Sequence, residues 1–119
     1  MICLTNQFGT IQISEDVITK IVGRSVEGCY GVVGMAATRA ADSLVELLSR
    51  DNPARGVKVS SADNQLVIDL FVIVEYGVSI FAVTSSAMDT VRYDVETQTG
   101  LKVSKVNIKV EGIRVTNKE

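Results

Sequence analysis

The segment that most constrains the fold is the run QLVIDLFVIVEY, at residues 65–76. Alternate residues from Leu66 to Val74 form one apolar face of a predicted strand. The opposite face carries three further apolar residues, Val67, Phe71 and Ile73. A strand that is apolar on both sides is usually central in its sheet or covered on both faces. These three residues would form an apolar patch if they faced water. The pattern therefore leaves two alternatives open, burial by the chain's own residues or contact with a partner.

Local signals place the other elements around this strand. Apolar alternation or helical spacing predicts strands at residues 8–14, 56–60 and 101–115, and helices at 15–27, 41–50 and 80–99. Ser14 and Ser79 stand where side-chain oxygens cap helices, and Gly100 is a typical stop signal. The pair Asp63-Asn64 suits a tight turn between two strands. The run at 31–37 fits a loop, an edge strand or a helical turn equally well.

In the last predicted strand, the alternation of apolar residues shifts by one position near the end. Val106, Ile108 and Val110 share one face, whereas Ile113 and Val115 have the opposite parity. One extra residue at Glu111-Gly112 would return all of them to one side. We predict a β-bulge there, with Gly112 adopting unusual backbone angles.

Together these elements predict one α+β domain over residues 1–119, with its core at about 8–115. The expected order is β-α-α-β-β-α-β. The helices should pack mainly on one face of a small mixed sheet of about four strands. A chain of 119 residues corresponds to about one domain, and no repeat or shift in composition divides it.

The chain contains no His, which removes much chemistry. It cannot build a Ser-His-Asp or Cys-His relay, or a His-ligated metal site, from its own residues. The hydroxyl run Thr84-Ser85-Ser86 has no obvious base beside it, and the acidic residues are too dispersed for paired acid-base work. We expect no catalytic residue, no cofactor and no metal, and so a protein that is not an enzyme.

Charge and cysteine content set further bounds. The net charge is -2 and the computed pI is about 5.1, whereas nucleic-acid-binding domains usually have a basic footprint, so nucleic acid is an unlikely partner. Cys3 and Cys29 are not spaced like the ligands of a metal site. We expect both to be reduced thiols in a cytosolic protein. The longest aliphatic-aromatic run, Leu70–Val74, is far shorter than the roughly 20 residues of a transmembrane helix. We expect a cytoplasmic, soluble protein that reaches a membrane only through a partner.

Four segments carry a resemblance to a known family. They are GTIQISEDVITKIV at 9–22, GCYGVVGMA at 28–36, LVIDLFVIVEYGVSI at 66–80 and TGLKVSKVNIKVEGIRV at 99–115. In this order they resemble the alkaline shock proteins, which are small cytosolic domains found mostly in Gram-positive bacteria. The resemblance implies a role in general stress or cell-envelope homeostasis, self-association, and for some members a membrane-anchored partner. It implies no catalytic residue or cofactor. Phe81-Ala82 departs from the more polar pair expected of the family, so Phe81 marks a candidate contact surface.

Two sets of residues are candidates for binding. Val67, Phe71, Ile73 and Phe81 form the candidate partner surface. Lys102, Lys105, Lys109 and Arg114 make the final strand basic and form a candidate anion contact, for an acidic partner or an anionic lipid surface. The default interpretation of the basic residues is a solvated strand face.

The sequence supports three hypotheses about function. The first is a non-enzymatic interaction domain that assembles with itself and with a protein partner. The second is a KH-like RNA-binding module, because Gly31-Val32-Val33-Gly34 matches the GxxG clamp that such domains place between two helices. The third is a subunit or regulator of an enzyme whose site is completed by another chain.

Overall fold

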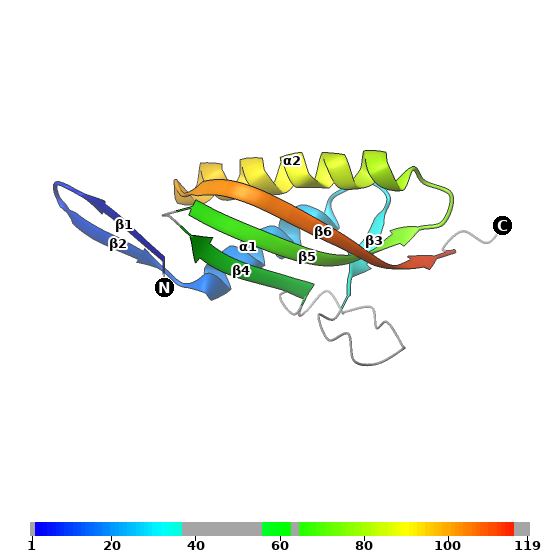
Figure 1. The fold of residues 1–119 in the computed structure, drawn as a ribbon, viewed down its shortest axis with the longest axis horizontal. Helices are drawn as coiled ribbons and strands as arrows, with labels where there is room; N and C mark the ends of the chain where they lie inside the picture. Colours follow the sequence, from blue (N-terminus) through cyan, green and yellow to red (C-terminus); the bar gives the residue numbers. More distant parts are fainter. Residues whose placement is uncertain (1, 37–55, 63–64, 116–119) are drawn as a thin grey trace.

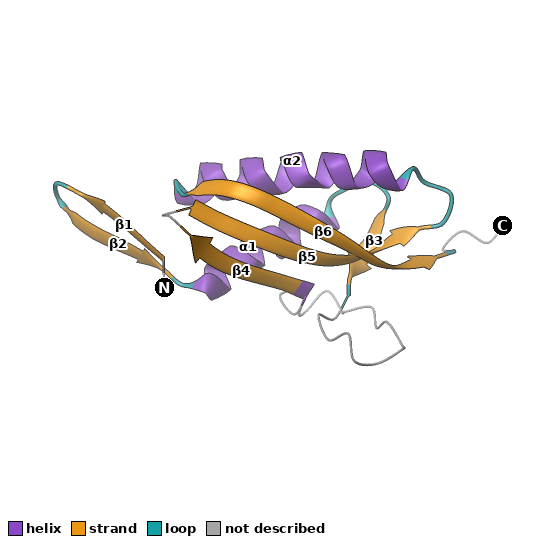
Figure 2. Ribbon diagram, viewed as in Figure 1, coloured by secondary structure: helices purple, strands orange, loops and turns teal. Residues whose placement is uncertain are grey.

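The computed structural model describes residues 2–36, 56–62 and 65–115. In chain order the N-terminal elements are β1 (Ile2–Asn6), β2 (Gly9–Ile13), α1 (Glu15–Glu27) and β3 (Val32–Met35). They are followed by β4 (Val57–Ala62), β5 (Gln65–Glu75), α2 (Ile80–Thr99) and β6 (Lys102–Arg114). Figures 1 and 2 show the helices on one side of the main sheet and the β1–β2 hairpin extending from one end of the molecule.

Strand β5 is the centre of the main sheet. Strand β6 pairs with it in parallel along one edge, from Gln65↔Lys102 to Glu75↔Arg114. The other edge is shared by two antiparallel strands, β4 on residues 65–70 and β3 on residues 72–74. The sheet is therefore four-stranded and mixed, which confirms the predicted α+β class.

The helices bury one face of this sheet. α2 packs over β6 and against α1, and α1 packs over β3 and β4. The core-facing stripe of α2 consists of Val83, Ala87, Val91 and Val95. On α1 the corresponding apolar residues are Ile18, Val22 and Val26. These side chains meet the even-numbered face of β5, so the core lies between the helix layer and the sheet.

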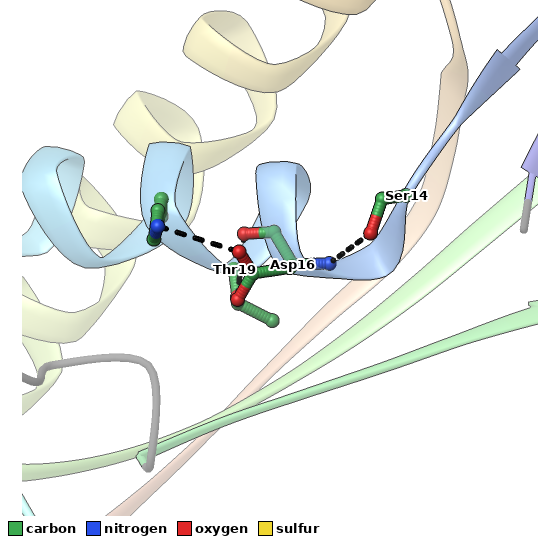
Figure 3. A network of polar contacts seen from close by, with 4 residues as sticks. Ser14, Asp16 and Thr19 are labelled. Atoms are coloured by element: carbon green, nitrogen blue, oxygen red, sulfur yellow. Dashed lines mark hydrogen bonds and ion pairs between the residues drawn. The ribbon is translucent and has the colours of Figure 1, made fainter.

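Capping residues set the ends of both helices where the sequence predicts them. The Asp16 N–H donates to Ser14 Oγ at 3.1 Å at the start of α1 (Figure 3). The Ala82 N–H donates to Ser79 Oγ at 3.3 Å at the start of α2. Gly100 ends α2 in the left-handed conformation at φ 79°.

Two bulges interrupt the β5–β6 ladder. Val72 lies opposite Val110 and Ile73 lies opposite Gly112, so Glu111 is the extra residue and the predicted bulge is confirmed. Gly112 does not adopt a positive φ, so the expectation of unusual angles there is wrong. A bulge can be built around a residue near the right-handed helical region, which needs no glycine. The second bulge leaves Ser104 unpaired between Val103 and Lys105.

The described order starts β-β-α-β, whereas the predicted order starts β-α, because β1 was not predicted and the run that contains β3 was left undecided. β1 forms a hairpin with β2, and β3 resolves the undecided run at 31–37 as a strand at its start. The predicted helix at 41–50 and the turn Asp63-Asn64 lie outside the described residues. The pairing of Ala62 with Gln65 nevertheless shows that β4 and β5 are joined as a hairpin.

Candidate interaction surface

Most aromatic side chains of this protein are exposed. The chain has three Phe, three Tyr and no Trp. Only Phe71 is buried, whereas the other five are at least two-thirds exposed: Phe8 89%, Tyr30 84%, Phe81 82%, Tyr76 69% and Tyr93 67%. Aromatic residues normally contribute large buried areas to cores, so their position on the surface needs an explanation.

Three of the exposed aromatics belong to segments that meet where β5 joins α2. A surface pocket of about 360 Å³ is lined there by Tyr30, Gly77, Val78, Ser79, Ala82, Val83 and Ser86. Tyr76 and Phe81 are chain neighbours of the pocket residues Gly77 and Ala82. We call Tyr30, Tyr76 and Phe81 the aromatic patch.

The structure separates the residues predicted as a partner surface. Phe71 and Ile73 are only 7% and 1% exposed, and they form a small cluster with Ala36 against which Val33 packs. Strand β3 brings this cover to β5, and the Ala36 N–H donates to the Phe71 carbonyl at 2.8 Å. The chain's own residues therefore bury these two side chains. Val67 is half-buried, and Phe81 is exposed.

The four predicted basic residues all lie on one face of β6. Lys102, Lys105, Lys109 and Arg114 are exposed and lie opposite Gln65, Val67, Phe71 and Glu75 of β5. This is the sheet face away from the helices. Lys109 Nζ lies 5.4 Å from the centroid of the Phe71 ring, within cation–π range, and Asn107 Nδ2 donates to Asp69 Oδ1 at 2.9 Å. We call these four residues the basic face of β6.

The two bulges are what bring the basic residues onto one face. Lys102 and Arg114 have even numbers, whereas Lys105 and Lys109 have odd numbers, so a regular strand would place the pairs on opposite faces. Each extra residue, Ser104 and Glu111, shifts the following side chains to the opposite face of β6, so all four basic side chains lie on one face. The bulge at Ser104 was not predicted, although the sequence carries a signal for it. The apolar positions that become buried change from odd at Val103 to even at Val106.

The Gly31–Gly34 segment is not a loop between two helices, as the RNA-clamp hypothesis requires. Val32 and Gly34 pair with β5, and the Glu75 N–H donates to the Gly31 carbonyl at 2.9 Å. A Cβ at Gly31 would lie 2.5 Å from Val83 Cγ2. The segment thus serves as a sheet strand closely packed against α2, and this corrects the KH-like hypothesis.

A small polar cluster joins the two helices beside the core. Ser25 is buried on α1, and its Oγ donates to the Asp94 carboxylate of α2. The Cys29 thiol donates to the Ser25 carbonyl at 3.4 Å. Burial raises the pKa of Cys29, and the Asp94 charge raises it further, partly opposed by a hydrogen bond with Thr90. The thiol therefore stays neutral at ordinary pH, which suits a structural role.

The described residues show neither a metal cluster nor a membrane-spanning helix. No group of His, Cys, Asp or Glu among them is arranged to hold a metal ion. No helix in that part of the chain is long and apolar enough to cross a membrane. Both cysteines are free thiols, Cys3 on the surface and Cys29 half-buried.

Comparison with known proteins identifies relatives over almost the whole chain. A model of the alkaline shock protein 23 family, described by a cell envelope-related function, matches residues 3–115. The uncharacterized protein YloU of Bacillus subtilis is 42% identical, covering 96% of this chain and 96% of its own length. YqhY of the same organism is 33% identical, covering 92% of this chain and 81% of its own.

More distant matches extend the comparison. A protein of Streptococcus pyogenes named as a stress response regulator gls24 homolog is 29% identical over 89% of this chain, which spans 59% of that protein. Among solved structures, the copper form of the MamM CTD superposes with a TM-score of 0.51 at 9% identity, covering 87% of this chain and 91% of that one. At this identity the match shows a shared fold alone.

Proposed function

Because this chain belongs to the alkaline shock protein 23 family, which has a cell envelope-related function, we propose that it is a non-enzymatic interaction domain in the stress response or the upkeep of the cell envelope. In this proposal the chain assembles with further copies of itself and binds a protein partner, which is anchored in the membrane. The chain itself works from the cytoplasm. One relative is named as a stress response regulator homolog, which supports a role in the stress response.

The exposed aromatic side chains are the observation that carries the proposal. Burying one Phe or Tyr removes about 150–250 Å² of surface from water, and at about 25 cal/mol per Å² this is worth several kcal/mol. A chain with no external contact would gain by keeping such residues inside, yet five of six lie outside. Aromatic residues are enriched at protein interfaces for the same physical reason.

The aromatic patch is the strongest contact candidate on this surface. Tyr30 is more than four-fifths exposed and lines a pocket that contains both apolar and hydroxyl groups, and Phe81, equally exposed, lies in the first turn of α2. Interfaces combine an apolar anchor with a few polar groups in this way. We therefore expect the patch to dominate assembly.

Sedimentation velocity over a range of protein concentrations tests self-association. The variant Tyr30→Ser with Phe81→Ser removes the patch, whereas Tyr93→Ser is a matched control farther along α2. We expect the wild type and the control to assemble, and the double variant to need at least about tenfold more protein. All three side chains are exposed, so the fold should remain intact.

Crosslinking in living cells, followed by identification of the attached proteins, tests the partner. We expect copies of this chain and a membrane-anchored protein, both reduced in the double variant. A wild type that remains a monomer at high concentration, and crosslinks to no protein in cells, would show that the proposed function is wrong.

A further inference from the structure

The outer edge of β6 offers a row of backbone groups to an additional strand. β5 occupies the inner edge from Lys102 to Arg114, and no strand of the described residues pairs with the outer edge. An edge of this kind is a template for strand addition. The stretch between the two bulges, Lys105–Val110, is regular in register. It would pair with an extended segment of about 20 Å.

Charge limits what can pair along this edge. The basic face of β6 places Lys105 and Lys109 on the same side of the regular stretch, with Lys102 and Arg114 at its ends. Two copies of β6 would bring like charges together, which destabilises cross-strand pairs. An added strand with acidic side chains at alternate positions would instead place a carboxylate beside each lysine.

The other face of the same edge is apolar. Ile108 and Val110 are half-buried on the helix side of β6, where they pack against the core. α2 lies along this side, since the Val103 N–H donates to Glu96 Oε2 at 2.9 Å. An added strand would therefore place its alternate side chains against apolar groups of β6 and beside α2.

α2 supplies exposed apolar side chains on its outer flank. Phe81 and Met88 are seven residues apart, so they lie on one side of the helix. Helical geometry turns this side roughly 120–140° away from Asp94, which contacts α1 through Ser25. α2 covers β6, whereas α1 covers β3 and β4 on the other side of β5. The flank of α2 that points away from α1 therefore lies on the side of the outer edge of β6.

We propose that the outer edge of β6 binds an extended acidic segment of a partner protein as an added strand. Its acidic side chains face Lys105 and Lys109, and its intervening apolar side chains face Ile108, Val110 and the outer flank of α2. This inference rests on the proposed function, because it names the class of segment that a partner would present. A lipid surface would contact the basic side chains without pairing to the backbone of β6. An experiment that detects backbone pairing therefore distinguishes a partner segment from a lipid surface.

The probe is a synthetic peptide of alternating glutamate and valine, roughly seven residues long to match the regular stretch. One control peptide carries lysine in place of glutamate, and another has N-methylated backbone amides that cannot pair. The protein variant is Lys105→Glu with Lys109→Glu. Its control, Lys20→Glu with Arg24→Glu, makes the same change in net charge at exposed sites on α1.

Fluorescence anisotropy measures binding, and NMR hydrogen exchange locates it. We expect the acidic peptide to bind at low salt, to weaken as salt rises, and to slow exchange of backbone amides in Lys105–Val110. The Lys105/Lys109 variant should bind at least about tenfold more weakly, and the Lys20/Arg24 control should bind normally. Neither control peptide should bind.

Several results would overturn the inference. They are absence of binding at low salt, equal binding of the N-methylated peptide, or protection confined to β4 or α2. Capture by vesicles containing phosphatidylserine without peptide binding would assign the basic face to lipid. Slowed exchange of β6 on raising protein concentration alone would assign the edge to a second copy. If the peptide fails but patch-dependent assembly and the crosslinked partner persist, the proposed function stands without this inference.

Discussion

Replacing Gly31 by Ala should destabilise the protein strongly, because two costs act at one position. Gly31 has φ +87°, a conformation that L side chains rarely adopt, and the backbone there is fixed by the hydrogen bond from Glu75. An added Cβ would lie 2.5 Å from Val83 Cγ2 and 3.3 Å from Val83 Cγ1. Val83 cannot easily turn away, since a β-branched side chain in a helix has essentially one χ1 rotamer.

The magnitude follows from adding these costs. Left-handed backbone costs a non-glycine residue about 1–2 kcal/mol, and overpacking a core costs about 1–3 kcal/mol. Gly31→Ala should therefore lower the free energy of unfolding by about 2–5 kcal/mol, out of the roughly 5–15 kcal/mol of a typical domain. At about 4 °C per kcal/mol for a chain of this size, Tm should fall by about 8–20 °C.

Urea denaturation of two variants separates the costs. Gly77 has φ +96° but would place a Cβ with nothing within 4 Å, so Gly77→Ala should lose only the backbone part, about 1–2 kcal/mol. In a Val83→Ala background, Gly31→Ala should lose less than it does in the wild type. Equal losses for Gly31→Ala and Gly77→Ala, with no relief from Val83→Ala, would refute the packing argument.

Two further predictions concern the start of α2 and the half-buried thiol. Ser79→Ala removes the side-chain oxygen that accepts from the Ala82 N–H, so the free energy of unfolding should fall by about 0.5–2 kcal/mol in urea denaturation. Iodoacetamide should label exposed Cys3 before Cys29 at neutral pH, as measured by mass spectrometry. The thiolate is the reactive form, and burial raises the pKa of Cys29, so its labelling should accelerate only in alkaline solution.

Both the capping prediction and the labelling prediction have an internal control in this chain. Ser86→Ala makes the same chemical change at an exposed position inside α2, where Ala favours the helix, so it should leave stability equal or slightly higher. Equal loss in the two Ser variants would contradict the capping argument. Equal labelling rates for both cysteines at neutral pH would contradict the burial of Cys29.

Local signals explain why much of the fold was predictable. Ser14, Ser79 and Gly100 each act through atoms within a few residues in the chain, so both helices begin and end as predicted. The bulge at Glu111 was also predictable. The apolar residues after it change parity, and only an extra residue keeps them on one side.

The features that were missed depend on contacts between distant residues. β1 shows no alternation because Ile2, Cys3 and Leu4 are all apolar, and it is a strand because Ile2 and Leu4 pair with Ile13 and Ile11. The cover over Phe71 comes from β3, a segment whose periodicity is ambiguous until it pairs with β5. The aromatic patch was only partly predicted for a similar reason. The sequence singled out Phe81, but the pocket beside Tyr30 exists only once α2 packs beside the end of α1.

The parallel pairing of β5 with β6 predicts an order of events during folding. Parallel neighbours cannot be joined by a tight turn, so residues 76–101 must cross over before β6 reaches its place. The antiparallel β4–β5 hairpin closes over a far shorter loop. The chain should therefore form this hairpin early and add β6 late, after α2 has docked. The edge that we propose for partner binding is then the last part of the sheet to be completed on the path to the native state.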